Sequence, residues 1–363
     1  MPRIQAFLGD DSNTKRTKAS TFVNFLLKIY FIPVNVTEEK IIFKIFHWKT
    51  IVYILYVLGF YSFYYFYPYL LGIDKQSSLP STDIQLISEY ILFALLVLCR
   101  TFSLVLSHGL QKLNPRRFNN TSHRNPKQMF RIILSFFMYV SGLFLIFVDL
   151  EKIRNIPFGK LALFVVMHLI ITFIDFFWEV SAPLLIQILA EDFIYDCKNA
   201  SAEENFIDII EWYQELNGSL QLYCLFLYSS YQFVFIFDIY NNFSVVTTTS
   251  QLTAITIFSI LGKLLLSVSM AWNIIALTSS LDSAFDSLQE MKEKIQKMIV
   301  SSYGQTEKQL NYLLERIKSL KPFSACGYFE ISKSTLTSML SVRYFPNKKN
   351  CLSQKRLLSE MSA

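Results

Sequence analysis

The sequence has few charged residues: Asp, Glu, Lys and Arg make up 17% of its 363 residues, whereas hydrophobic residues make up 52%. A typical soluble domain carries about 25% charged residues. The chain contains long uncharged runs. A helix of about twenty apolar residues is as long as the roughly 30 Å hydrocarbon layer of a bilayer is thick. The composition therefore favours a lipid bilayer, and not water, as the main solvent of this chain.

Motifs of enzyme and metal chemistry are also missing from the sequence. The four histidines are scattered, none forms a paired metal-binding motif, and there is no Gly-rich phosphate loop or nucleophile elbow. We therefore expect no catalytic residue, no metal site and no cofactor. An intramembrane acyltransferase that uses His168 is the remaining enzymatic interpretation.

Targeting and partner signals are equally sparse. The first twenty residues are charged and have no apolar core, so the sequence predicts no cleavable signal peptide. The net charge of +6 is modest and the basic residues lie between apolar runs, so we expect no nucleic-acid partner. None of the five cysteines falls in a segment predicted to be extracellular, so no extracellular disulfide framework is expected.

The apolar runs predict an all-α protein, a polytopic bundle of transmembrane helices within residues 48–278. Their aromatic ends are typical of the membrane interface, where Trp and Tyr gather. A shorter stretch, residues 21–34, is interrupted by Lys28 and fits an interfacial segment better than a span. The six predicted spans are about 51–71, 84–107, 130–150, 161–189, 220–238 and 252–277.

Loop charges predict the orientation, because Lys and Arg accumulate on the cytoplasmic side of short loops. If the N-terminus is cytosolic, 21 Lys and Arg lie inside and 4 lie outside. Residues 1–47 then form a cytosolic N-terminal segment, and the chain is a multi-pass protein of the plasma membrane.

Two segments outside the spans show the periodicity of amphipathic helices. They predict cytosolic helical extensions, one before the fifth span and one within residues 279–340, which pack either between subunits or within one subunit. The apolar stripes are Phe206, Ile209, Ile210, Tyr213 and Leu216, then Leu281, Phe285, Leu288, Met291, Ile295 and Met298, continued by Leu310, Leu313, Leu314 and Ile317.

Ionisable residues within spans usually face the bundle interior, because exposing them to lipid is costly. Arg100 is expected to reach the inner interface with its charged end, and Lys263 to do likewise or to pair with Asp175 or Glu179. The sequence further predicts an outward-facing ligand pocket of aromatic and polar side chains, although packing between helices is the alternative role for each. The candidate ligand-binding residues are Glu89, Tyr90, Phe144, Phe147, Met167, His168, Thr172, Tyr231, Phe235 and Thr256.

The segment KPFSACGYFEISKSTLTSML, residues 321–340, resembles the stretch before the last helix of insect gustatory receptors. The family's Phe, small residue, Gly, Phe and Val/Ile correspond here to Phe323, Ala325, Gly327, Phe329 and Ile331. Upstream, Tyr213-Gln214-Glu215-Leu216 with Asn217 looks like the family's pattern before the fifth helix. The predicted cytosolic N-terminus also agrees with the inverted topology of that superfamily.

The family's seventh helix, which carries Thr-Tyr, five mostly apolar residues and Gln-Phe, has no counterpart in this sequence. Residues 341–363 are basic and polar, and we interpret them as an aberrant tail that replaces this helix. Val342–Ala363 would then be intron read-through, since Val-Arg-Tyr can be encoded by a sequence that begins like an intron donor site.

The resemblance implies a tastant-gated, non-selective cation channel that assembles as a homo- or heterotetramer with other gustatory receptor subunits. In that family the seventh helix lines the pore, so no pore residue can be assigned here and the chain alone is expected not to conduct. A six-span transporter is the chief alternative, although the hydropathy pattern shows no duplication. A G-protein-coupled receptor would require an extracellular N-terminus and a seventh span.

Overall fold

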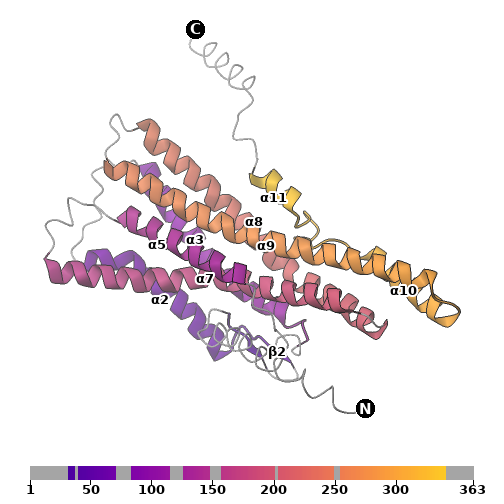
Figure 1. Ribbon diagram of the computed structural model, residues 1–363. Coiled ribbons are helices and arrows are strands. Elements are labelled where there is room, and N and C mark those ends of the chain that lie inside the picture. Colours follow the sequence, from indigo (N-terminus) through magenta and orange to yellow (C-terminus); the bar gives the residue numbers. More distant parts are fainter. Residues whose placement is uncertain are drawn as a thin grey trace, which may run out of the picture.

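The computed structural model describes residues 32–36, 40–70, 83–114, 126–147, 157–200, 203–248 and 254–340. This part of the chain is mostly helical, as the composition predicts (Figure 1). The predicted tail, residues 341–363, and most of the predicted interfacial stretch lie outside the described residues. The elements are β1 (Asn35–Val36), β2 (Ile41–Ile42), α2 (Trp48–Leu70), α3 (Asp83–Leu110), α5 (Pro126–Phe147), α7 (Phe158–Asn199), α8 (Glu203–Thr248), α9 (Ala254–Val300), α10 (Gln305–Ser319) and α11 (Lys333–Leu340).

Three helices are much longer than a bilayer is thick. Helices α7, α8 and α9 contain 42, 46 and 47 residues. At 1.5 Å per residue they are about 63–70 Å long, more than twice the hydrocarbon thickness. They include the predicted spans 161–189 and 220–238 and the described part of the span 252–277, and they continue beyond these spans without a break. Helix α10 folds back along the end of α9 (Figure 1).

Two helical segments among the described residues are long and apolar enough to cross a membrane, Phe158–Asn199 and Ile260–Val300. Three shorter apolar segments overlap the first three predicted spans, at Trp48–Phe63, Val97–Leu110 and Ile132–Gly142. The helical character of these regions agrees with the sequence analysis. The six-span arrangement itself remains a prediction.

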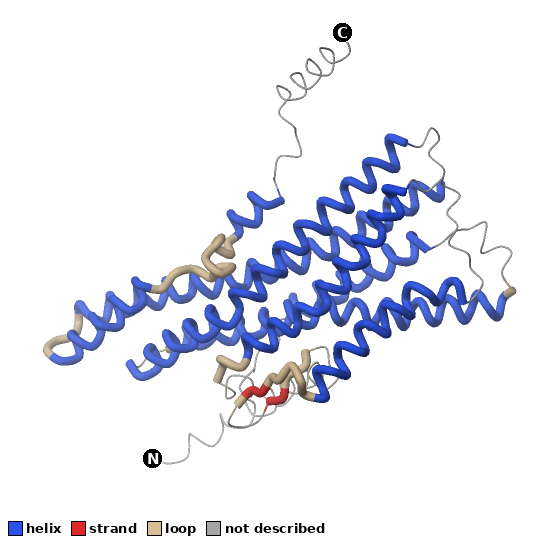
Figure 2. Tube along the Cα trace, turned by 180° about the vertical axis from the view of Figure 1, so that it is seen from behind, coloured by secondary structure: helices blue, strands red, loops and turns tan. Residues whose placement is uncertain are grey.

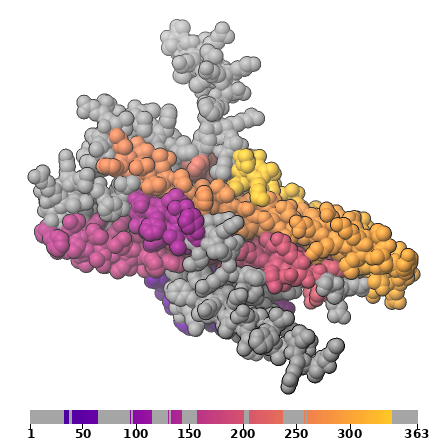
Figure 3. Space-filling model, in the orientation of Figure 1, coloured from indigo at the N-terminus to yellow at the C-terminus, as the bar shows by residue number. Residues whose placement is uncertain are grey.

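The predicted amphipathic stripes form the core of one half of the molecule. They continue the long helices, as predicted for helical extensions: the stripe at 206–216 belongs to α8, and the stripe at 281–298 belongs to α9. Leu281, Leu288 and Ile295 are fully buried together with Ile210 and the apolar face of α10. The stripes therefore pack against each other within one chain, and the α9–α10 hairpin projects at one end of the molecule (Figure 3).

The opposite half has an apolar surface. In α9, the large apolar side chains that are exposed occur from Ile257 to Ile275, and among the described residues none follows until Val300 at the end of the helix. The same halves of α7 and α8 are exposed and apolar, and α2 and α5 add to them. We call this surface the apolar belt; it comprises Ile51, Val52, Leu55, Tyr56, Leu58, Phe63, Phe130, Ile133, Leu134, Phe137, Leu163, Val166, Leu169, Ile170, Phe173, Leu222, Phe226, Phe233, Ile236, Ile257, Leu261, Leu264, Val268, Trp272 and Ile275.

The two strands form a short antiparallel pair beside the start of α2 (Figure 2). Asn35 pairs with Ile42, and Val36 pairs with Ile41. Ile32, Val34, Ile41 and Phe43 are buried in the main core. The end of the predicted interfacial stretch, residues 32–34, therefore packs against protein.

Candidate functional site

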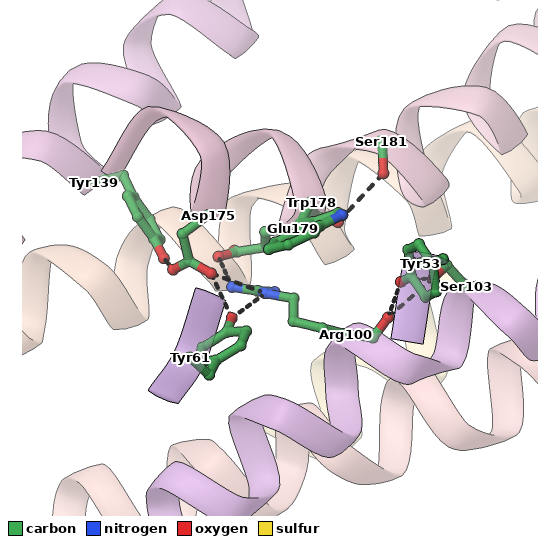
Figure 4. Close-up of polar contacts among 9 residues, drawn as sticks. All are labelled: Tyr53, Tyr61, Arg100, Ser103, Tyr139, Asp175, Trp178, Glu179 and Ser181. Carbon is green, nitrogen blue, oxygen red and sulfur yellow. Dashed lines mark hydrogen bonds and ion pairs between the residues drawn. The ribbon is translucent and has the colours of Figure 1, made fainter. Parts of the chain in front are cut away.

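A buried arginine pairs with two carboxylates in the interior of the bundle. Arg100 of α3 places Nε 3.1 Å from Asp175 Oδ1 and Nη2 3.3 Å from Glu179 Oε2, both on α7 (Figure 4). The two carboxylates are four residues apart, so they share one face of α7. The side chains of Arg100 and Glu179 are 4% and 0% exposed. This arrangement corrects the expectation that Arg100 reaches the inner interface.

Two tyrosine hydroxyls also donate hydrogen bonds to Asp175. Tyr61 of α2 donates to Oδ1 at 2.5 Å and accepts a hydrogen bond from Arg100 Nε at 2.8 Å. Tyr139 of α5 donates to Oδ2. The group of five residues, Tyr61, Arg100, Tyr139, Asp175 and Glu179, is called the Arg100 cluster below. It links four helices, α2, α3, α5 and α7, that are far apart in the sequence (Figure 4).

A second set of hydrogen bonds continues from the cluster along α2 and α3. The Tyr53 hydroxyl donates to the carbonyl oxygen of Arg100 at 2.6 Å and is hydrogen-bonded to the Ser103 hydroxyl. Trp178 of α7 packs edge-on against Phe60, with ring centroids 5.0 Å apart. Aromatic rings of α2 thus cover the side of α7 next to the charged groups.

The charges of the cluster do not balance, because one guanidinium faces two carboxylates. Asp175 accepts hydrogen bonds from Arg100, Tyr61 and Tyr139. Glu179 accepts one from Arg100 through Oε2, and the buried Asn273 side chain of α9 is its neutral polar neighbour. Burying a charge is costly unless it is paired, so Glu179 is the least compensated member of the cluster.

Asp175 and Glu179 are predicted to face inward, with pairing to one of them as one of the two roles considered for Lys263. The structure pairs them with Arg100, and Lys263 has no ion pair among the described residues. Sequence reasoning missed Tyr61 and Tyr139 entirely. One signal could have indicated Arg100 as the partner. It is a cation within one apolar segment, and another apolar segment carries two acids on one face.

Five predicted ligand-binding residues have described side chains. On α7, His168 and Thr172 are buried and Met167 is half-buried. His168 stacks on Phe164, with ring centroids 5.9 Å apart, and Thr172 lies one turn before Asp175. Tyr231 and Phe235 of α8 are half-buried. The side chains of the other five lie outside what the structure describes, although their backbone is helical: Glu89, Tyr90, Phe144, Phe147 and Thr256.

The segment that carries the family resemblance forms a tight hairpin turn before α11. Ile331 N donates to Phe323 O at 2.7 Å, and Ala325 N donates to Phe329 O at 2.9 Å. At the tip, Cys326 and Gly327 have φ of 52° and 77°. Two successive positive φ values define a type I′ turn, and Gly is the residue that adopts this conformation without strain.

This hairpin packs against α8 at Tyr213, which belongs to the other resembling segment. The Tyr213 hydroxyl donates to Lys321 O at 2.7 Å, and its ring lies 4.9 Å from the Phe323 ring. Burial raises the pKa of the Tyr213 phenol, so the phenol stays a neutral donor. Phe323 and Ile331 are buried in the same core, and Phe329 contacts Tyr228.

Comparison with known proteins adds no relative. No protein-family model matches the chain, and no curated protein sequence is significantly similar to it.

Proposed function

We propose that the chain is a multi-pass protein of the plasma membrane, with six spans and a cytosolic N-terminus. The apolar belt supports this proposal, because so many exposed large apolar side chains would be unfavourable in water and are favourable against lipid. The other halves of α7, α8 and α9, which have few exposed large apolar side chains, would stand in the cytosol, on the side predicted for Lys and Arg.

We further infer that the chain is a gustatory-receptor-like subunit, a tastant-gated, non-selective cation channel that works as a homo- or heterotetramer with other such subunits. The contact between Tyr213 and the hairpin at Phe323 carries this inference. The two segments on which the resemblance rests are about a hundred residues apart and pack directly on each other. Because the two segments pack on each other in one core, a fold that has one of them would also need the other.

An electrophysiological comparison tests the function. The chain is expressed as printed, and also with a helix carrying the Thr-Tyr and Gln-Phe motif joined after Leu340. We expect sugars or bitter compounds to evoke cation current from the second protein alone, because residues 341–363 hold neither motif. The matched control replaces both motifs of the added helix by alanine. Current from the chain as printed would contradict the assigned role of the seventh helix.

A topology experiment tests the membrane arrangement separately. Epitope tags at residue 1 and in the predicted outer loop at residues 72–83 are stained in intact and permeabilised cells. We expect the N-terminal tag to be stained only after permeabilisation and the loop tag to be stained in both. An N-terminal tag that is accessible in intact cells would count against the receptor family and favour a G-protein-coupled arrangement.

A six-span transporter is the second candidate, and the Arg100 cluster favours it. Buried carboxylates paired with arginine inside a membrane mark ion and proton pathways in transporters. Uptake of an organic substrate into proteoliposomes that contain the chain as printed, driven by a proton gradient, would support this candidate over the channel subunit.

A further inference from the structure

The residues just before and at the start of α2 form an exposed surface that is both aromatic and basic. Phe46 is 92% exposed, Ile45 63% and Trp48 56%. Lys44 is exposed beside them, and Lys49 is half-buried with Nζ 6.0 Å from the centre of the Trp48 ring. We call residues 44–49 the α2 platform.

The backbone of the α2 platform is held in place, so the exposure is built into the fold. His47 N donates to Lys44 O at 3.0 Å, and the Thr50 hydroxyl donates to the same oxygen at 2.9 Å. The preceding residue, Phe43, is buried in the main core, and its carbonyl accepts from Gln111 Nε2 at 2.8 Å. The platform thus lies beside the end of α3, next to the exposed Lys112.

The charge of this region has one sign. From residue 40 to residue 73 the sequence contains no Asp or Glu, while Lys40, Lys44 and Lys49 fall within it. Glu38 and Glu39 precede it and lie outside the described residues. The Lys49 ammonium contacts Asn35 Oδ1 at 3.3 Å, which is a neutral partner. An anion that approaches the platform therefore meets two lysines and no described carboxylate on the platform itself.

The platform also adjoins the apolar belt, which begins on α2 at Ile51. Aromatic side chains at such a boundary lie at the level of lipid headgroups, and lysines on the cytosolic side attract anionic lipids. A soluble anion would use the lysines but would leave Phe46 and Ile45 in water.

We propose that the α2 platform binds an anionic phospholipid of the cytosolic leaflet. Phe46, Ile45 and Trp48 lie at the boundary between headgroups and acyl chains, and Lys44 and Lys49 contact the headgroup phosphate and carboxylate. The inference rests on the proposed function for the cytosolic position of the N-terminus.

Tryptophan quenching by brominated lipids tests the proposal on the full chain in nanodiscs. Nanodiscs contain phosphatidylcholine and phosphatidylserine, with bromine on the acyl chains of one lipid or the other. The signal of Trp48 is obtained by subtracting that of Trp48→Phe, because the chain has 4 tryptophans. We expect brominated phosphatidylserine to quench Trp48 more strongly than brominated phosphatidylcholine at equal mole fraction, and the preference to weaken at high salt.

Charge variants show whether the platform lysines cause this preference. The double variant Lys44→Gln, Lys49→Gln should lose it, at about fivefold in relative lipid affinity for each lysine. The matched control, Lys297→Gln with Lys308→Gln, removes two exposed lysines from the α9–α10 hairpin and should retain it.

The outcomes separate this proposal from the proposed function. Equal quenching by both lipids, or a preference that survives in the platform variant, would overturn the lipid site and leave the membrane arrangement intact. The absence of quenching by either lipid would overturn both, because Trp48 would not lie at a bilayer.

Discussion

Replacing Arg100 by methionine should destabilise the bundle strongly, because it leaves two buried carboxylates without their cation. Methionine is close to arginine's stem in shape, so the change removes the charge and hydrogen bonds more than the packing. Arg100 contacts Asp175, Glu179 and Tyr61. Removing one partner of a buried ion pair costs about 3–5 kcal/mol, whereas exposed pairs cost about 0–1 kcal/mol.

The loss of stability caused by Arg100→Met should be smaller when the two carboxylates are replaced by uncharged residues as well. Replacing a buried ion group by well-packed hydrophobic residues is often neutral for stability, and the large loss comes from a charge left without its partner, which uncharged amides avoid. We therefore expect the triple variant Arg100→Met, Asp175→Asn, Glu179→Gln to regain most of the loss. Between the single acid variants, Asp175→Asn should cost more than Glu179→Gln, since Asp175 accepts three hydrogen bonds and Glu179 one.

The assay is reversible unfolding of the purified chain in mixed micelles with an increasing fraction of sodium dodecyl sulfate. Tryptophan fluorescence reports the transition, because the Trp178 ring stacks on Tyr61 of the cluster. An Arg100→Met variant as stable as the parent would refute the reasoning, since the guanidinium would then not be compensating buried charge. A triple variant no more stable than Arg100→Met would refute it as well.

Three further perturbations follow from the geometry. A Cβ on Gly109 would lie 2.0 Å from a carbonyl oxygen of α8, so Gly109→Ala should cost about 1–3 kcal/mol or more in the same unfolding assay, whereas Gly59→Ala, with nothing within 4 Å, should be neutral or stabilising. Gly327→Ala should cost about 1–2 kcal/mol, because its φ of 77° strains a side chain. In single-cysteine variants, maleimide at pH 8 should label the exposed Cys326 and not the buried Cys197. Burial raises the pKa of the Cys197 thiol to about 12, so little reactive thiolate is present at pH 8. Rapid labelling of Cys197 would contradict its buried position.

Helix positions could be predicted from the sequence because uncharged runs and 3.6-residue periodicity are local signals. The ends of the helices could be predicted less accurately than their positions. The stripe at 206–216 is predicted as a helical extension before the fifth span, but its spacing does not show that the two form one helix; in the structure it continues into that span as α8, and Gly218 between them does not break the helix. A single glycine costs only about 1 kcal/mol in a helix, which the packing of Tyr213 and Leu216 offsets.

The candidate site was predictable only in part, for a physical reason. That Asp175 and Glu179 face inward follows from their helical spacing and the cost of exposing charge to lipid. Their pairing with Arg100 depends on how α3 crosses α7, which no local pattern encodes. Tyr61 and Tyr139 are 2 of 20 tyrosines, and their sequence neighbourhoods do not distinguish them.

Well-packed apolar residues of the same volume often stabilise a fold as well as a buried ion group does, so stability alone does not explain the Arg100 cluster. The triple variant described above therefore separates fold from function. Tested with the added seventh helix, it should fold and reach the cell surface but lose its tastant-evoked current, because it has lost both ion pairs between α3 and α7. An unchanged current would mean that the cluster serves the fold alone, and the ligand response would then depend on residues elsewhere in the bundle.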